Sequence, residues 1–381
     1  GKVLIKNEPT FDLITQPNLI DDIDSFLDEI QPVIFLSESD KFQYKKLQKE
    51  KAFANKELVL KKDLSAAEIA RFNVRSFNFQ NAFIAKRYRR ISDYPNIFSH
   101  VLGYTSRTED AYKSMPEIPR SHWRDAELVY AHGLIKGRTG LEEIYEDHLR
   151  GTYGERVYEI NSMGKLVQSL SIIKPLKGSD LHTNLDVEAQ KTAAKFLGNR
   201  RGAVVAIDLD SGGINVLYSS PTYSINQLSN GMNEDDFQIL INDPDKPFFN
   251  RALKGRYPPA STIKPAIGMY GVSNNIVNWD FEMKDPGFFT LPETGRVFRG
   301  WRKGGHGKVN MHKAFLVSSN TYFFSLAYQA DIKELSSYLT SLGFGQKVCL
   351  DCFDEDQALV PTPEWKYSIM NAGWVKGDTV N

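Results

Sequence analysis

The residues best suited to chemistry in this sequence are Ser261 and Lys264, in the stretch Tyr257-Pro258-Pro259-Ala260-Ser261-Thr262-Ile263-Lys264-Pro265. Two prolines predict an extended approach to a helix that starts at Ser261, and Pro265 is tolerated because the first turn needs no amide donors. On a helix, residues three apart share one face, with roughly 5–6 Å between their Cβ atoms. A lysine whose pKa is lowered can take the proton of a serine hydroxyl and make it a nucleophile. The start of a helix also favours a developing oxyanion.

The Ser-x-x-Lys spacing alone is weak evidence, because it occurs at Ser162, Ser171 and Ser261. The first two lie in strand-like, charged surroundings, where the serine and the lysine would point to opposite faces of a strand. Ser261 is the one at a proline-bounded helix start. A plain helix-capping serine is the alternative interpretation there.

A second polar motif, Ser318-Ser319-Asn320, precedes a strongly apolar helix expected over residues 321–328. In such a turn the hydroxyl of Ser318 can relay a proton while the amide of Asn320 orients a substrate amide. Ser273-Asn274-Asn275 has the same form at the end of the Ser261 helix. Helix capping is again the alternative for Ser318.

The elements that would position these residues become regular after Asp180. Asp186 can cap a helix that ends at Gly198. The β-rich runs 203–207 and 214–218 flank a Gly-containing turn, which is typical of a hairpin. We therefore predict an α+β fold with an antiparallel sheet and flanking helices over residues 181–381, after a separate non-catalytic domain over residues 1–180.

The composition is that of an ordinary globular protein, with 381 residues of which 41% are hydrophobic and 25% charged. Basic and acidic residues balance at 47 each, so no nucleic-acid surface is expected, and the basic run 86–90 is interpreted as a solvated strand or loop. Cys349 and Cys352 lack the further ligands of a zinc site and are interpreted as incidental, in a fold that does not depend on disulfides. No apolar run reaches the ~18–20 residues that cross a bilayer.

The order of the two motifs, Ser-x-x-Lys and then Ser-x-Asn, resembles the series found in penicillin-binding proteins and serine β-lactamases. Further stretches are similar to the elongation-type class B penicillin-binding proteins, and the similarity extends from about residue 60 to 381. These stretches are His100-Val101-Leu102-Gly103-Tyr104, Gly140-Leu141-Glu142 through Leu149-Arg150-Gly151, Asn250-Arg251-Ala252, Asp285-Pro286-Gly287 and Gly304-Gly305-His306-Gly307.

The sequence also departs from that family. Ala260 stands where the family has glycine, and the third family motif, Lys-Ser/Thr-Gly, is absent, so we expect it beyond this chain's end. Some relatives hold a zinc ion with two aspartates, a histidine and a cysteine. Asp285 and His306 match two of these ligands, but Gly300 and Ser319 occupy the other positions. We therefore expect no metal, and no other cofactor.

The resemblance implies a D,D-transpeptidase that cross-links peptidoglycan stem peptides during cell elongation and is the target of β-lactams. Ser261 would attack the D-Ala carbonyl and form an acyl-enzyme, and Lys264 would accept its proton. Ser318 would help pass that proton to the leaving D-Ala, and Asn320 would hold the peptide amide.

The resemblance also implies an extended N-terminal pedestal, followed by a transpeptidase fold whose C-terminal part is missing from this chain. The implied location is the periplasmic face of the bacterial inner membrane, through an N-terminal anchor outside this chain. The implied partners are an MreC-type scaffold protein and a RodA-type glycosyltransferase. Aromatic residues of the first half could either fill its core or form such a protein–protein surface; they are Phe72, Phe77, Phe79, Phe83, Tyr88 and Tyr94.

Two other functions stay open at this point. A β-lactamase or β-lactam sensor of the same superfamily usually lacks a large N-terminal module, and no Glu-x-x-x-Asn element that could supply a deacylating base follows Ser318. A scaffold-binding module with an inactive site is supported by the missing third motif.

Overall fold

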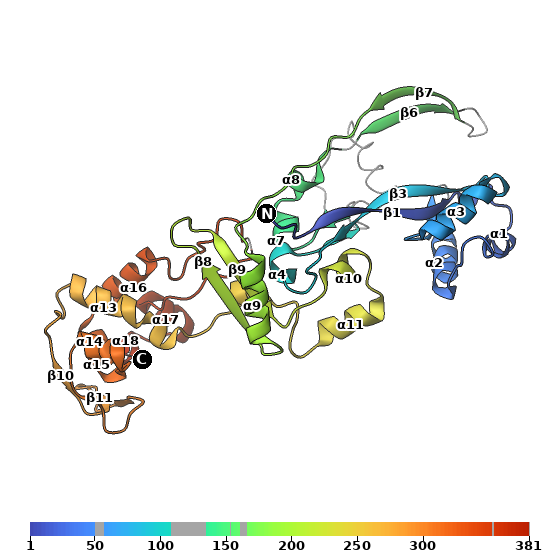
Figure 1. Ribbon diagram of the computed structural model, residues 1–381. Helices are drawn as coiled ribbons and strands as arrows, with labels where there is room; N and C mark the ends of the chain where they lie inside the picture. Colours follow the sequence, from blue (N-terminus) through green and yellow to red (C-terminus); the bar gives the residue numbers. More distant parts are fainter. Residues whose placement is uncertain (50–56, 108–134, 153, 161–165, 353, 381) are drawn as a thin grey trace. The chain divides into compact units, whose positions relative to one another are not determined.

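The computed structural model describes residues 1–49, 57–107, 135–152, 154–160, 166–352 and 354–380 (Figure 1). The chain forms two compact units, residues 1–252 and 253–381, each with helices and antiparallel strands. This mixed architecture confirms the predicted α+β class. Among the described residues, no helix is long and apolar enough to span a bilayer.

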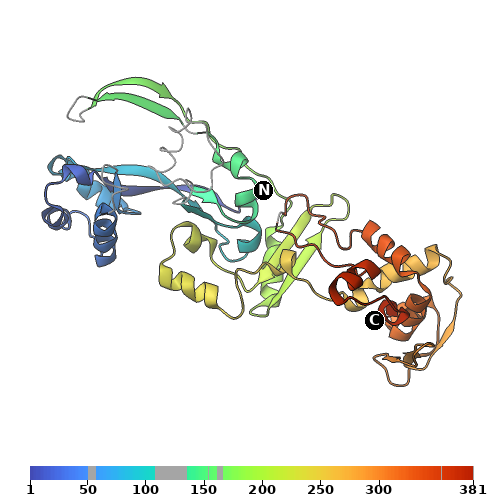
Figure 2. The same ribbon diagram turned by 180° about the vertical axis from the view of Figure 1, so that it is seen from behind.

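The first unit is built on a three-stranded antiparallel sheet in which β1 (Lys6–Thr15) lies between β2 (Leu58–Lys61) and β3 (Ala82–Ile91). Three helices gather at one end of the sheet, as both views show (Figures 1 and 2): α1 (Ile23–Ile30), α2 (Glu38–Lys49) and α3 (Ala66–Arg75). Their apolar faces and the sheet share a core that includes Leu13, Ile30, Ile34, Tyr44 and Phe72. Burial of this continuous apolar surface stabilises the packing of the three helices on the sheet.

The basic run 86–90 lies on β3 and is therefore a strand, which is one of the two conformations, strand or loop, that the sequence predicted. Some aromatic residues of this region are buried and others are exposed. Phe72 and Phe79 are buried, whereas Phe77, Phe83 and Tyr88 are exposed. The first unit therefore has both an aromatic core and exposed aromatic side chains.

Short elements complete this part of the chain. They are α4 (Ser99–Leu102), β4 (Thr105–Arg107), β5 (Ile135–Gly137), α7 (Gly140–Ile144), α8 (Glu146–Arg150), β6 (Glu155–Ile160), β7 (Leu166–Ile173), α10 (Ile225–Ser229), α11 (Glu234–Asn242) and α12 (Arg251–Lys254). The strands β4–β5 and β6–β7 form two separate antiparallel pairs.

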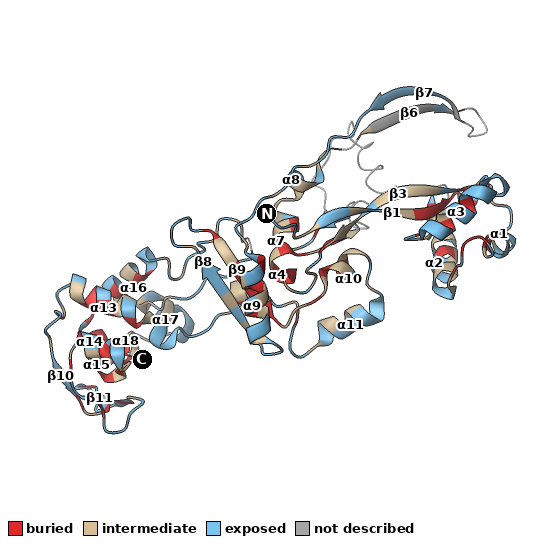
Figure 3. Cartoon of the chain, in the orientation of Figure 1, coloured by how far each residue is buried: buried red, intermediate tan, exposed pale blue. Residues whose placement is uncertain are grey.

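The helix and hairpin predicted after Asp180 are confirmed. Helix α9 spans Val187–Leu197, with the Asp186 carboxylate accepting from the Ala189 amide and Gly198 at its end. Strands β8 (Gly202–Ile207) and β9 (Ile214–Ser220) pair antiparallel, and α9 packs on β9 through Ala193, Val216 and Tyr218. The buried residues of this hairpin lie on β9, which α9 covers, whereas β8 is largely exposed (Figure 3). The division into compact units after residue 252 does not test the predicted boundary between domains near residue 180, which stays a prediction.

The second unit is mainly helical. Its helices are α13 (Lys264–Ser273), α14 (Met311–Leu316), α15 (Asn320–Gln329), α16 (Ile332–Ser341), α17 (Pro363–Met370) and α18 (Lys376–Val380), and its short strands are β10 (Met283–Asp285), β11 (Phe288–Thr290), β12 (Val297–Arg299) and β13 (Gly307–Val309). A Cβ atom on Gly271 would lie 2.6 Å from Leu326 Cδ1, and one on Gly268 would lie 2.7 Å from Phe315 Cζ. Glycine at these positions lets α13 approach its neighbours closely, which brings the N-termini of α13 and α15 together.

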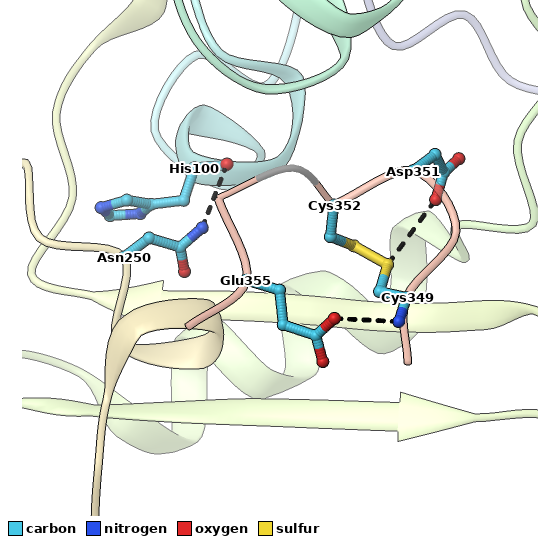
Figure 4. The surroundings of a disulfide bond; sticks show 6 residues. All are labelled: His100, Asn250, Cys349, Asp351, Cys352 and Glu355. Carbon is cyan, nitrogen blue, oxygen red and sulfur yellow. Dashed lines mark hydrogen bonds between the residues drawn. A yellow bond between two sulfur atoms is a disulfide. The ribbon is translucent and has the colours of Figure 1, made fainter. Parts of the chain in front are cut away.

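Cys349 and Cys352 are joined by a disulfide bond, which differs from the expectation that the pair is incidental (Figure 4). The backbone brings their Cα atoms to 5.3 Å, inside the range that a disulfide needs. The Glu355 carboxylate accepts from the Cys349 amide at 3.0 Å and closes the same turn. The sequence spacing alone could not show that the two thiols meet.

Candidate active site

Ser261 lies in a 3₁₀ turn, Ala260–Ile263, that leads directly into α13. The regular α-helix begins at Lys264, later than the predicted start at Ser261. Ala260 has φ of +48°, in the left-handed region that is unfavourable for residues with a Cβ atom. This backbone conformation explains why glycine suits the position before the nucleophile. The side chain of Ser261 is exposed.

The Lys264 ammonium is buried and its three hydrogens match three acceptors. Nζ lies 2.9 Å from the backbone oxygen of Ser318, 3.1 Å from Ser318 Oγ and 2.7 Å from Oδ1 of Asn320. All three acceptors come from the turn before α15 or from its first residue. The lysine therefore ties the two sequence motifs together.

Burial lowers the pKa of Lys264. All three acceptors are neutral oxygens, and no carboxylate within the described part of the chain contributes to the pKa. The ring of Phe323, whose centroid is 5.4 Å from Nζ, contributes some cation–π attraction instead. Desolvation without a partner charge favours the neutral amine, which is the form that acts as a base.

Ser318 stands between the lysine and Ser261. Its Oγ donates to Ser261 Oγ at 3.1 Å and accepts from Lys264 Nζ at 3.1 Å. With a neutral lysine the same chain can run in the opposite direction, because each hydroxyl is both a donor and an acceptor. The three side chains thus form a continuous path for a proton.

The turn that carries Ser318 is held by hydrogen bonds to other segments of the second unit. Ser318 has φ of +50°, a strained conformation for a residue with a side chain. Ser319, not Ser318, caps α15, since its Oγ accepts from the Tyr322 amide at 3.2 Å. Its Oγ also donates to Asp285 Oδ2 at 2.7 Å, and Trp301 Nε1 donates to the Val317 oxygen at 3.2 Å. Sequence analysis missed both supports.

The other candidate motifs are not assembled in this way. Ser171 lies within β7, as a strand residue, and Ser162 lies outside the described residues. In the alternative motif Ser273-Asn274-Asn275, the Asn274 side chain donates to the Tyr270 oxygen at 2.9 Å and the Asn275 amide donates to the Val272 oxygen at 3.1 Å, both at the end of the same helix. The structure therefore brings together Ser261, Lys264, Ser318 and Asn320.

The zinc site of some relatives does not fit these residues. His306 Nδ1 lies 2.9 Å from Asp285 Oδ2, so the two matching side chains contact each other. Gly300 has no side chain, and the hydroxyl of Ser319 already binds Asp285. Within the described ranges, the one cluster of three His, Cys, Asp or Glu side chains is Cys349, Asp351 and Cys352, and its sulfurs are bonded to each other.

The family-like stretches before residue 252 form buried contacts in the first unit. His100 Nε2 lies 2.8 Å from the Pro247 oxygen, and Asn250 Nδ2 lies 3.4 Å from the His100 oxygen. Glu142, also buried, forms an ion pair with Arg90 at 2.7 Å. Burial, together with the nearby Arg251 guanidinium, lowers the pKa of His100 to about 4, despite the Pro247 oxygen that opposes it. These contacts hold the first unit together, and none of the hydrogen bonds and ion pairs described for these residues involves Ser261.

Comparison with known proteins identifies the class to which this site belongs. Residues 1–183 match the penicillin-binding protein dimerisation domain, and residues 202–381 match the penicillin-binding protein transpeptidase domain. The chain therefore belongs to the penicillin-binding proteins. The resemblance inferred from its motifs is confirmed.

Within this family the chain is similar to elongation-type members. It is 35% identical over 381 residues to the peptidoglycan D,D-transpeptidase MrdA of Acinetobacter baumannii, and it spans 55% of that protein's length. A solved complex between penicillin-binding protein PBP2 and MreC from Helicobacter pylori matches with a TM-score of 0.83 at 28% identity, covering 100% of this chain and 69% of that one. Pseudomonas aeruginosa PBP2 in complex with WCK 5153 matches with a TM-score of 0.66 at 32% identity, covering 77% and 59%.

Proposed function

We propose that this chain carries the reactive serine of a peptidoglycan D,D-transpeptidase. The observation that supports this most directly is the cluster of Ser261, Ser318 and Lys264, linked by two contacts of 3.1 Å around a buried lysine. An exposed serine next to a desolvated amine is the arrangement that acyl transfer needs. The similarity to MrdA proteins supports the same reaction.

In the first half of the reaction, Ser261 Oγ attacks the carbonyl of the penultimate D-Ala of a stem peptide. Its proton passes to Ser318 Oγ while the proton of Ser318 passes to neutral Lys264. Ser261 Oγ thus exchanges its O–H bond for a bond to the carbonyl carbon, and Ser318 remains a hydroxyl. The C–N bond then breaks, and the protonated lysine returns a proton through Ser318 to the departing nitrogen of D-Ala. The product is an ester on Ser261 and free D-Ala.

In the second half, the amine of a neighbouring stem peptide attacks this ester. Lys264 again takes a proton, from the attacking amine, and Ser261 recovers its own when the ester bond breaks. Asn320 holds the amide of the donor peptide, since its side-chain nitrogen is not used by Lys264, which contacts Oδ1. β-Lactams acylate the same serine, because their strained amide presents the same carbonyl.

We propose a location on the periplasmic face of the bacterial inner membrane. The Cys349–Cys352 disulfide supports an oxidising compartment, where such bonds persist. We further propose that the first unit docks on an MreC-type scaffold and, with it, a RodA-type glycosyltransferase. The exposed aromatic residues Phe77, Phe83 and Tyr88 and the similarity to an MreC-bound protein support the scaffold part of this proposal.

The test is turnover of a stem pentapeptide by the full-length protein with a labelled amine acceptor. We expect the cross-linked product and free D-Ala in equal amounts, with none from Ser261→Ala. Release of D-Ala with hydrolysed peptide alone would indicate a carboxypeptidase. A protein that hydrolyses β-lactams rapidly and leaves the stem peptide intact would belong to the β-lactamase class instead.

A further inference from the structure

The carboxylate of Asp285 is almost fully buried at the end of β10, where its side chain is 2% exposed. It accepts from the Gly287 amide at 2.7 Å through Oδ1, and Oδ2 contacts His306 Nδ1 at 2.9 Å and the Ser319 hydroxyl at 2.7 Å. A buried carboxylate is costly unless its oxygens are bonded, and here both are. Three separate segments of the second unit therefore meet at one side chain.

Ser319 is the residue between Ser318 and Asn320, and it is completely buried. Its backbone amide donates to the Ala314 oxygen at 2.9 Å, and its hydroxyl is shared between Asp285 and the Tyr322 amide. With Ser319 pointing inward, its two neighbours point towards Lys264. Ser318, the residue before this anchor, has a left-handed conformation with φ of +50°, and such strained conformations persist where the surrounding structure holds them.

We propose that Asp285 is a positioning residue for the acyl-transfer chemistry. Through Ser319 it holds Ser318 and Asn320 in place around Lys264, and it does so as part of a metal-free cluster with His306. Asp285 and His306 correspond to two zinc ligands of some relatives, but here they contact each other while Gly300 and Ser319 replace the remaining ligands. The hydrogen bond from Ser319 to Asp285 thus takes the place of coordination in securing the turn.

The ionised form of Asp285 suits this role. Burial alone would raise the pKa of Asp285, but the hydrogen bonds from His306, Ser319 and the Gly287 amide outweigh it and hold the pKa below its usual value. An anionic acceptor makes stronger hydrogen bonds than a neutral one. His306 is itself enclosed, its side chain 5% exposed with its ring beside that of Trp301, so the aspartate cannot turn away towards solvent on that side.

The inference rests on the proposed function, and its test is the rate at which the full-length protein is acylated by a fluorescent penicillin. We expect Asp285→Asn and Ser319→Ala each to lower the acylation rate constant by about tenfold to hundredfold, because misplacing a reacting group by about 1 Å has effects of this size. The matched controls are Asp331→Asn and Thr362→Ala, which alter the N-caps of α16 and α17 in the same unit. The controls should acylate at the wild-type rate.

A readout that simple destabilisation would not change is the pH profile of acylation. When the turn loosens, water reaches Lys264 and its pKa rises, so the rate of Ser319→Ala should reach half its maximum at a higher pH than that of the wild type. Treatment with a chelator should leave the wild-type rate unchanged, and added zinc should not restore the variants. If Asp285→Asn fails to fold, the acylation rate and pH profile of Ser319→Ala alone test the inference.

Wild-type rates with unshifted pH profiles in both variants would overturn the inference, and so would loss of acylation on removal of a metal. A wild-type protein that takes no penicillin at all would instead contradict the proposed function. The two failures are therefore distinguishable.

Discussion

The Lys264 ammonium nitrogen lies 2.7 Å from Oδ1 of Asn320, a residue 56 positions away in the sequence. This contact joins the start of α13 to the start of α15, and the two contacts to Ser318 complete the enclosure of the lysine. The reactive centre is thus defined by two helix starts that pack together, rather than by a single loop.

The first prediction concerns Lys264 as the base. Since burial lowers the pKa of Lys264, the neutral amine forms at a lower pH than for an exposed lysine. The acylation rate should rise with pH through this lowered pKa and reach half of its plateau at a pH below the usual lysine value of about 10.4. Stopped-flow measurement of penicillin acylation across the pH range checks this. A rate that rises only near pH 10, or a wild-type rate in Lys264→Met, would contradict it.

The second prediction concerns the strained alanine before Ser261. Ala260 has φ of +48°, a conformation that destabilises the folded state of an alanine by roughly 1–2 kcal/mol. Glycine removes this strain, and the gain is larger than the free energy lost because glycine makes the unfolded chain more flexible. Ala260→Gly should raise the free energy of unfolding by about 0.5–1 kcal/mol. Thermal denaturation of the two proteins measures the change.

Its matched control is Ala70→Gly, at an exposed position inside the regular helix α3. There glycine should lower the free energy of unfolding by about 0.5–1 kcal/mol. If both substitutions destabilise the protein equally, the left-handed conformation of Ala260 is wrong.

The third prediction is a pH dependence of stability from His100. Its pKa is about 4 in the folded protein and 6.5 ordinarily, so between these values the unfolded chain binds the proton more readily. Stability is therefore complete above pH 6.5 and falls as pH drops to about 4, by an amount on the order of 3 kcal/mol. Denaturant titrations of the first unit's transition at several pH values test this.

His100→Gln removes the titrating ring and should flatten that part of the profile. His312→Gln replaces an exposed histidine and should keep the wild-type slope. An unchanged slope in His100→Gln would mean that another group causes the acid sensitivity.

The fourth prediction concerns the scaffold-binding surface. Lys86 lies over the ring of Tyr88, which is 54% exposed on β3, whereas Arg87 and Arg90 in the same basic run pair with Asp12 and Glu142. The double change Lys86→Glu and Tyr88→Ala reverses an exposed charge and removes exposed aromatic surface, and it leaves the residues of these two pairs unchanged. It should weaken binding of an MreC-type protein by about tenfold, as measured by calorimetric titration.

The control for this experiment is the pair Lys347→Glu and Tyr367→Ala, which makes the same chemical changes on exposed residues of the second unit. Its binding should equal that of the wild type. Loss of binding in the control, with wild-type binding in the β3 variant, would move the docking surface away from the first unit.

Local features of this fold could be predicted from the sequence, because their signals lie within a few residues. Asp186, three residues before Ala189, marks the start of α9, and the Gly-containing turn marks the β8–β9 hairpin. The three-stranded sheet of the first unit was not predicted, because its strands join residues far apart in the sequence, from Lys6 with Ile91 to Thr15 with Ala82.

In the candidate site, too, the features with local sequence signals could be predicted and those that depend on long-range contacts could not. Spacing and helix context single out Ser261 and Lys264, and the motif order adds Ser318 and Asn320. The contact between Asp285 and Ser319 joins residues 34 apart and has no local signal. The positive φ of Ala260 and the pairing of Cys349 with Cys352 likewise depend on backbone paths that the surrounding packing determines.

The central claim is that Ser261 is the acylated residue, and mass spectrometry of the full-length protein after incubation with penicillin tests it most directly. We expect one penicilloyl adduct per protein, on the peptide that contains Ser261, and no adduct in Ser261→Ala. Ser171→Ala, which changes a strand serine of the same Ser-x-x-Lys spacing, should be acylated like the wild type. An adduct on the peptide that contains Ser171 or Ser162, or one that persists in Ser261→Ala, would contradict the account.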